Sequence, residues 1–111
     1  MILQTHLLNN ALIADIQLKE ANLSNSEQFK GELISLINNG NKFVVVNFEQ
    51  VTYVDSSFLG ALVSALKLAM NNSADIAVVG LNSDIRSLFQ LVRLDKVFRI
   101  YTNTQEALTG A

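Results

Sequence analysis

The segment at residues 42–48 constrains the fold more than any other part of this sequence. It reads Lys-Phe-Val-Val-Val-Asn-Phe, a nearly continuous apolar run that is rich in β-branched residues. Runs of this kind are typical of strands that are buried on both faces, as in a parallel sheet. We therefore expect Val44, Val45 and Val46 to lie in a central parallel strand.

Helical and extended patterns alternate on both sides of this strand. Apolar residues at i, i+4, i+7 and i+8 predict a helix that starts near Ser26 and ends at Asn38-Asn39-Gly40. The pair Asn9-Asn10 suits a tight hairpin turn. We expect strands at residues 2–8, 11–18, 42–48, 75–79 and 97–101, and helices that begin near residues 26, 56, 83 and 103.

Ser83 and Asn103 are expected to cap the last two helices. The resulting order, β-β-α-β-α-β-α-β-α, predicts a single α/β domain over residues 1–111. Its sheet should be mainly parallel, with an antiparallel hairpin at the start.

Composition narrows the class of protein. Half of the 111 residues are hydrophobic, which is enough apolar material for one core without disulfides or a structural metal. The absence of cysteine excludes thiolate catalysis and cysteine-type zinc sites, and a formal net charge of -2 gives no basic surface for nucleic acid. No apolar run approaches the roughly 20 residues that span a bilayer, and the start of the chain does not resemble a signal peptide. We therefore expect a cytoplasmic protein with no cofactor, no metal and no insertion into a membrane.

The segment at residues 51–60 joins the central strand to the next helix and carries the main chemical signal. Asp55 is placed to cap that helix, because its carboxylate can accept hydrogen bonds from free backbone N–H groups. Ser56 and Ser57 then fall in the first turn, where the helix dipole favours negative charge. A phosphate there would add about -1.5 to -2 charges beside Asp55 while leaving the fold intact. Asp-Ser-Ser at a helix start is also common as simple capping, so the residues alone leave both interpretations open.

The helix from residue 56 is apolar over more of its circumference than a surface helix needs. One stripe is expected to face the core, and a second apolar surface lies beside it. That second surface is covered either by a neighbouring helix or by a docking partner next to the serines. The expected core stripe is Leu59, Leu62, Val63, Leu66 and Met70, and the second surface is Phe58, Ala61, Ala65, Leu68 and Ala69.

The sequence resembles the STAS domain found in bacterial anti-sigma factor antagonists. Residues 54–60, Val-Asp-Ser-Ser-Phe-Leu-Gly, are similar to the family signature apolar-Asp-Ser-(Ser or Thr)-Gly-apolar-Gly. Residues 19–22, Lys-Glu-Ala-Asn, fall where the family tends to have Gly-Glu-apolar-Asp, and residues 85–94 are similar to a family segment that ends in Gly-Leu. The expected order of strands and helices also matches the STAS fold, so the resemblance covers nearly the whole chain.

The resemblance implies a partner switch that is not an enzyme. In this family the unphosphorylated protein binds an anti-sigma factor that is also a serine kinase of the GHKL type, and a sigma factor is released. Phosphorylation of the serine directly after the aspartate breaks the complex, and a PP2C-type phosphatase restores it. Ser56 matches this phospho-acceptor, with Ser57 as its neighbour. The alternative within the family is a STAS scaffold, or a subunit of a signalling or membrane-transporter complex, without a phospho-switch.

Three positions near the expected acceptor depart from the family pattern. Phe58 replaces the usual glycine and is expected to place a bulky ring where a kinase approaches. Lys19 and Asn22 replace a glycine and an aspartate in the loop expected to face the serines, which removes one negative charge and adds one positive charge. The surface around Ser56 that binds the partner is expected to consist of Asp55, Ser57, Phe58, Lys19 and Asn22.

No group of residues in the sequence indicates catalysis. His6 is the only histidine, and it is expected in an edge strand with no nucleophile or orienting carboxylate to pair with it. Phosphate-binding loops, HExxH and EF-hand motifs and nucleophile elbows are missing from the sequence. We therefore expect no catalytic residues and no metal ligands.

Overall fold

The computed structural model describes residues 1–110, so the last residue of the expected domain, Ala111, lies outside the described part. Strands and helices alternate along the chain after an initial hairpin. The elements are β1 (Leu3–Leu8), β2 (Ala11–Ile16), β3 (Glu20–Ala21), α1 (Leu23–Asn38), β4 (Phe43–Asn47), β5 (Tyr53–Val54), α2 (Ser56–Asn71), β6 (Asp75–Val79), α3 (Ser83–Leu91), the 3₁₀ turn η1 (Leu94–Lys96), β7 (Arg99–Tyr101) and α4 (Thr104–Thr109).

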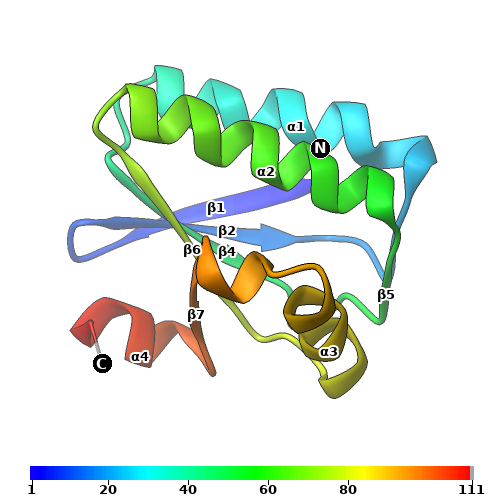
Figure 1. Ribbon diagram of the computed structural model, residues 1–111. Coiled ribbons are helices and arrows are strands. Elements are labelled where there is room, and N and C mark those ends of the chain that lie inside the picture. The colour runs from blue at the N-terminus through cyan, green and yellow to red at the C-terminus, as the bar shows by residue number, and fades with distance from the viewer. Residues whose placement is uncertain (111) are drawn as a thin grey trace.

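Five of the strands form the main sheet, in the order β1-β2-β4-β6-β7. The pair β1-β2 is antiparallel, whereas β4 pairs parallel with both β2 and β6, and β6 pairs parallel with β7. Helices α1 and α2 lie side by side over one face of this sheet, and α4 lies on the other (Figure 1). The predicted α/β fold, with a mainly parallel sheet and an antiparallel hairpin at its start, is confirmed.

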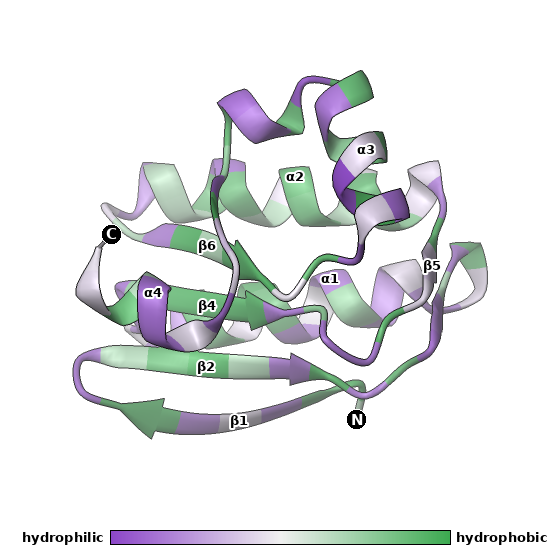
Figure 2. Cartoon of the chain, turned by 90° about the horizontal axis from the view of Figure 1, so that it is seen from below, coloured by the Kyte–Doolittle hydropathy of each residue, from purple (hydrophilic) through white to green (hydrophobic). Residues whose placement is uncertain are grey.

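Strand β4 lies in the middle of the sheet and is apolar on both faces. Val44 and Val46 belong to the main core beneath α1 and α2, whereas Val45 belongs to a smaller core that Ala107 of α4 covers. All three valines are fully buried. Hydrophobic residues dominate β4 and the adjacent β6, whereas β1 at the edge is mixed (Figure 2). The continuous apolar run in the sequence therefore reflects a strand with a helix layer on each side.

The hairpin forms as expected, with Asn9 at a φ of 57° in its turn and Leu8 paired with Ala11. Other boundaries differ from the prediction because capping side chains and turns set them. Helix α1 begins at Leu23, three residues before the predicted start at Ser26, because Asn22 caps it with its side-chain oxygen. Helix α3 is capped by Asn82 and not by Ser83, which is its first helical residue.

Several strand boundaries were also predicted too generously, by one residue at the start of β1 and at both ends of β4 and by two residues in β2 and β7. Strand β2 ends at Ile16, two residues before residue 18. Strand β7 begins at Arg99 because the chain before it turns through η1 and leaves Val97 exposed. The predicted cap at Asn103 is confirmed, since its Oδ1 accepts a hydrogen bond from the Glu106 N–H at 3.0 Å.

Helix α1 covers the second apolar surface of α2. Phe58 stacks on Phe29 of α1, and the alanines of that surface, small enough for the two helices to approach closely, are all buried. The prediction of a neighbouring helix is confirmed, and the alternative of a docking patch on this surface is wrong. Met70, expected in the core stripe, is instead 64% exposed at the end of α2. The buried members of the second surface are Phe58, Ala61, Ala65 and Ala69.

Candidate functional site

Asp55 holds the first turns of two helices together. Its Oδ1 accepts a hydrogen bond from the Phe58 N–H at 3.0 Å, which is the predicted N-cap of α2. Its Oδ2 accepts a second hydrogen bond from the Leu23 N–H at 2.9 Å, at the first residue of α1. One carboxylate therefore satisfies a free N–H group at the start of each helix. This fixes the position of the residue that follows Asp55.

The loop before α1 lies directly against the segment before α2, as the resemblance to the STAS family implied. Strand β3 pairs parallel with β5, so Glu20 lies beside Tyr53 and Ala21 beside Val54. The Lys19 carbonyl accepts hydrogen bonds from the Thr52 N–H at 2.7 Å and the Thr52 hydroxyl at 3.1 Å. The sequence did not predict these two-residue strands, which lack the length that makes an alternating pattern visible.

Ser56 is exposed at the first position of α2, and Ser57 is half-buried behind it. The N–H groups of this first turn and the helix dipole create a positive field at Ser56. A negatively charged group on that hydroxyl is therefore compatible with the backbone. The same group would lie next to the Asp55 carboxylate, whose two oxygens already accept hydrogen bonds.

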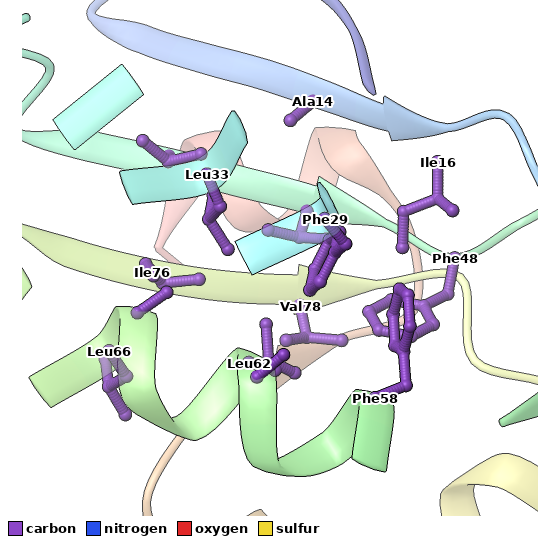
Figure 3. Close-up of a cluster of buried hydrophobic side chains, with 14 of the residues drawn as sticks. Ala14, Ile16, Phe29, Leu33, Phe48, Phe58, Leu62, Leu66, Ile76 and Val78 are labelled. Atoms are coloured by element: carbon purple, nitrogen blue, oxygen red, sulfur yellow. The ribbon is translucent and has the colours of Figure 1, made fainter. Parts of the chain in front are cut away.

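Phe58 lies in the core and not on the surface of the site. It is fully buried, stacked on Phe29 with ring centroids 4.1 Å apart, and it meets Phe48 edge-on at 6.4 Å. Figure 3 shows the Phe58 ring pointing from α2 toward these two rings. The prediction that Phe58 meets an approaching kinase or partner is wrong. The helical period shows only that this face of α2 is apolar, and the tertiary structure places α1 over it.

Asn22 and Lys19 occupy different positions in the loop. Asn22 is half-buried, and its Oδ1 accepts hydrogen bonds from the Ser24 N–H at 3.0 Å and the Ser24 hydroxyl at 2.6 Å. Asparagine and aspartate cap helices about equally well, so asparagine performs this structural role without a charge. The Lys19 side chain is exposed, one residue before the strand that pairs with β5.

Two exposed apolar side chains flank the site, and the sequence analysis did not single them out. Leu23 is 71% exposed at the start of α1, and Tyr53 is 54% exposed in β5. The backbone N–H of Leu23 donates a hydrogen bond to Asp55, and Tyr53 lies two residues before Asp55 in the chain. Tyr53 lies in a two-residue strand and Leu23 at the first position of a helix, where neither gives a periodic signal, so only the structure identifies them as surface residues.

None of the helices in residues 1–110 combines the length and the hydrophobicity needed to cross a membrane. Within the same range, no three histidine, aspartate or glutamate side chains lie close enough to hold a metal ion. His6 lies 3.8 Å from Asp15, measured from Nδ1 to Oδ2, and it is mostly exposed. This pair lies on the edge strand β1 and its neighbour β2, and not among the residues around Ser56.

Sequence comparison identifies relatives with a named regulatory role. The sequence model of the STAS domain matches residues 17–107. A Thermotoga maritima protein provisionally named an anti-sigma factor antagonist is 29% identical over 91 residues, which cover 81% of this chain and 80% of that protein. The anti-sigma-B factor antagonist of Staphylococcus aureus is 30% identical over 66 residues, which cover 60% of this chain and 61% of that protein.

Solved structures with the same fold come from several kinds of protein. A STAS domain protein of Planctomyces limnophilus superposes with a TM-score of 0.89 at 18% identity, covering 97% of this chain and 96% of that one. The phosphorylated form of the Bacillus protein SpoIIAA superposes at 0.72 with 17% identity, covering 96% of both chains. A sulfate transporter family protein of Wolinella succinogenes superposes at 0.80 with 14% identity, covering 94% of this chain and 86% of that one. At these identities the similarity shows the fold alone.

Proposed function

This chain belongs to the STAS domain family, and we propose that it is a non-enzymatic partner switch controlled by phosphorylation of Ser56. Its proposed partner is an anti-sigma factor that doubles as a serine kinase of the GHKL type, with a PP2C-type phosphatase that resets the switch. Relatives named as anti-sigma factor antagonists support this regulatory role. A partner of this kind acts on transcription, which would place the protein in the cytoplasm.

The observation that carries the proposal is the position of Ser56. Its hydroxyl is exposed at the first position of a helix, directly after an aspartate that is hydrogen-bonded to the start of both α1 and α2. A kinase can therefore reach this serine, and the backbone around it is held in place. A bound partner would cover Ser56 together with the exposed side chains of Lys19, Leu23 and Tyr53.

The phosphate would act through its charge. Phosphorylation adds about -1.5 to -2 charges beside Asp55, in a surface that becomes desolvated when the partner binds. Desolvation and repulsion between like charges in an interface cost several kcal/mol when the charges are unpaired. The anchored first turn of α2 leaves the fold unchanged, so the partner responds to the charge alone.

The proposal is tested by isolating the partner from the native host and incubating it with the protein and ATP. Phosphopeptide mapping should locate the phosphate on Ser56. Ser56→Ala should bind the partner but resist phosphorylation, whereas the matched control Ser57→Ala should still be phosphorylated. Ser56→Asp should bind roughly 5- to 150-fold more weakly than the wild type. Phosphate found only on another residue, or a Ser56→Asp variant that binds as well as the wild type, would reject the switch.

A second candidate is a STAS subunit of a membrane-transporter or signalling complex without a phospho-switch. This alternative stays open because membership of the STAS family does not by itself distinguish the two functions. The same isolation experiment separates the two functions. Recovery of transporter subunits without a kinase, together with wild-type binding by Ser56→Asp, would support the second candidate.

A further inference from the structure

A small pocket opens beside the candidate site, between β5 and the first turns of α3, which lie close together at one end of the molecule (Figure 1). Its volume is about 210 Å³. Small-molecule sites usually measure about 300–1,000 Å³, so this pocket has the size for a single side chain. The lining residues are Thr52, Tyr53, Val54, Asp84, Ile85 and Leu88.

The pocket is held open by a side chain that joins its two walls. Asn82 donates a hydrogen bond from Nδ2 to the Thr52 carbonyl at 3.3 Å, and its Oδ1 accepts one from the Ile85 N–H at 2.7 Å. Asn82 therefore links the start of α3 to the segment that leads into β5. Val54 and Ile85 are buried at the base of the pocket. A pocket formed in advance lowers the entropy cost of receiving a side chain.

The charged side chain that lines this pocket is the carboxylate of Asp84. Asp84 is exposed in the first turn of α3 and makes no ion pair within residues 1–110. None of the residues three or four positions from Asp84 is basic, and Arg86, two positions away, projects from a different side of the helix. Glu20 is exposed and lies beside Tyr53 in the paired strand, and the exposed Lys19 precedes it in the chain.

We propose that this pocket receives an arginine side chain of the protein partner, which deepens the proposed function and rests on it. The apolar base formed by Val54, Ile85 and Leu88 suits the aliphatic stem of arginine. The carboxylate of Asp84 suits its guanidinium group, and the exposed ring of Tyr53 offers a face on which a cation stacks. Arginine and tyrosine in small desolvated pockets are the residues that most often dominate the free energy of binding. The pocket-lining residues Thr52 to Val54 lie two to four residues before Ser56, so one partner can contact both.

The first test needs no knowledge of the partner. Isotope-labelled protein is titrated with the acetylated and amidated peptide Gly-Arg-Gly, and separately with the same peptide carrying citrulline, which is neutral and has nearly the same shape. The arginine peptide should shift the amide resonances of Tyr53, Asp84 and Leu88 and bind about fivefold more tightly than the citrulline peptide. Equal binding of the two peptides, or shifts elsewhere only, would overturn the proposal.

The second test uses variants with a matched charge change. Asp84→Asn should weaken binding of the arginine peptide about fivefold and binding of the isolated partner about tenfold. The control Asp75→Asn removes the same charge at the other end of the parallel strands, where β6 begins, and should change neither affinity. An Asp84→Asn variant that binds the partner like the wild type would overturn the proposal.

These results are separable from those that test the switch. Ser56→Asp should leave binding of the arginine peptide nearly unchanged, because the peptide fills only the pocket. If Ser56→Asp keeps full affinity for the partner while Asp84→Asn loses it, the phospho-switch is rejected and the pocket is supported. If Ser56→Asp loses affinity while Asp84→Asn does not, the pocket is rejected and the switch is supported.

Discussion

The ring of Phe58 stacks on the ring of Phe29, with centroids 4.1 Å apart and planes inclined by 23°. Phe58 belongs to the first turn of α2 and Phe29 to α1, and both are fully buried. The turn that carries Ser56 is therefore anchored in the core one residue beyond Ser57. This arrangement favours a switch that acts through local charge and not through a movement of α2.

Phe58→Ala should lower the free energy of unfolding by about 3–5 kcal/mol, because it removes a buried ring and leaves a cavity between α1 and α2. Phe58→Gly, which introduces the residue usual in the family, should cost about 1 kcal/mol more through lower helix propensity. Urea unfolding measures both variants. Tyr53→Ala, at an exposed aromatic residue, serves as the control and should cost much less. A loss below about 1 kcal/mol for Phe58→Ala would contradict the structural role of the ring.

Asp55→Ala should lower the free energy of unfolding by about 2 kcal/mol, because it leaves the N–H groups of Phe58 and Leu23 without their acceptor. Asp55→Asn has a single carbonyl oxygen, so it should keep one of the two hydrogen bonds and lose about half as much. Thermal and urea unfolding of the two variants give this ranking. Equal stability of both variants and the wild type would show that the carboxylate does not hold the two helices together.

Ser56→Asp should leave the melting temperature within about 2 °C of the wild type, because the new carboxylate meets the positive end of the α2 dipole while lying next to Asp55. Ser64→Asp places the same charge in the middle of α2, where the N–H groups are already bonded and the side chain is half-buried. That control should melt at a clearly lower temperature. Equal destabilisation of Ser56→Asp and Ser64→Asp would contradict the claim that the start of α2 tolerates a negative charge.

Glu32 ties the start of β1 to α1 and should make stability depend on pH. Its two carboxylate oxygens accept hydrogen bonds from the Ile2 and Leu3 N–H groups, each at 2.9 Å. Partial burial raises the pKa of the Glu32 carboxyl, but these two bonds, one from Gln28 and the nearby N-terminal ammonium together outweigh that effect and lower the pKa below its ordinary value. The folded state therefore binds this proton less readily than the unfolded state. Its stabilisation is present above the unfolded pKa of about 4.3 and is lost as the pH falls through the lower folded pKa.

Glu32→Gln should thus be less stable than the wild type by about 1 kcal/mol at pH 7, and this difference should shrink below about pH 4. Urea unfolding at several pH values between 7 and 3 measures this difference in the free energy of unfolding. Glu27→Gln, at an exposed residue of the same helix, is the control and should differ little from the wild type at any pH. A stability difference between Glu32→Gln and the wild type that stays constant down to pH 3 would contradict the stabilising role of the ionised Glu32 carboxylate.

Gly80 and Gly31 should respond to alanine in opposite directions. Gly80 has a φ of 76°, and an added Cβ would lie 2.8 Å from Asn47 Oδ1 and 3.0 Å from the Glu49 N, so Gly80→Ala should cost more than about 1 kcal/mol. Gly31 lies inside α1, where an added Cβ would meet no atom within 4 Å beyond its chain neighbours and the nearby helix backbone, so Gly31→Ala should stabilise the protein by up to about 1 kcal/mol. Thermal unfolding of Gly80→Ala and Gly31→Ala measures both effects. Similar changes in both variants would refute the distinction.

Local sequence signals predicted the features that depend on neighbouring residues. The apolar run at residues 42–48 predicted the buried central strand β4, and Asp55 predicted the cap of α2. Both follow from short-range chemistry: strands buried on two faces exclude polar residues, and a carboxylate satisfies free N–H groups at a helix start. The position of Ser56 in the first turn could be predicted for the same reason.

The tertiary structure decided which apolar surfaces are covered and which side chains remain exposed. Helical periodicity placed Phe58 on an apolar face of α2, but only the packing of α1, with Phe29 twenty-nine residues away in the chain, shows that this face is buried. Likewise, the pairing of β3 with β5 and the second hydrogen bond of Asp55, to Leu23, join segments about thirty residues apart. The sequence by itself determined where apolar faces and capping groups occur. Which faces meet depends on how distant segments pack, because periodicity describes one element at a time and carries no information about its neighbour.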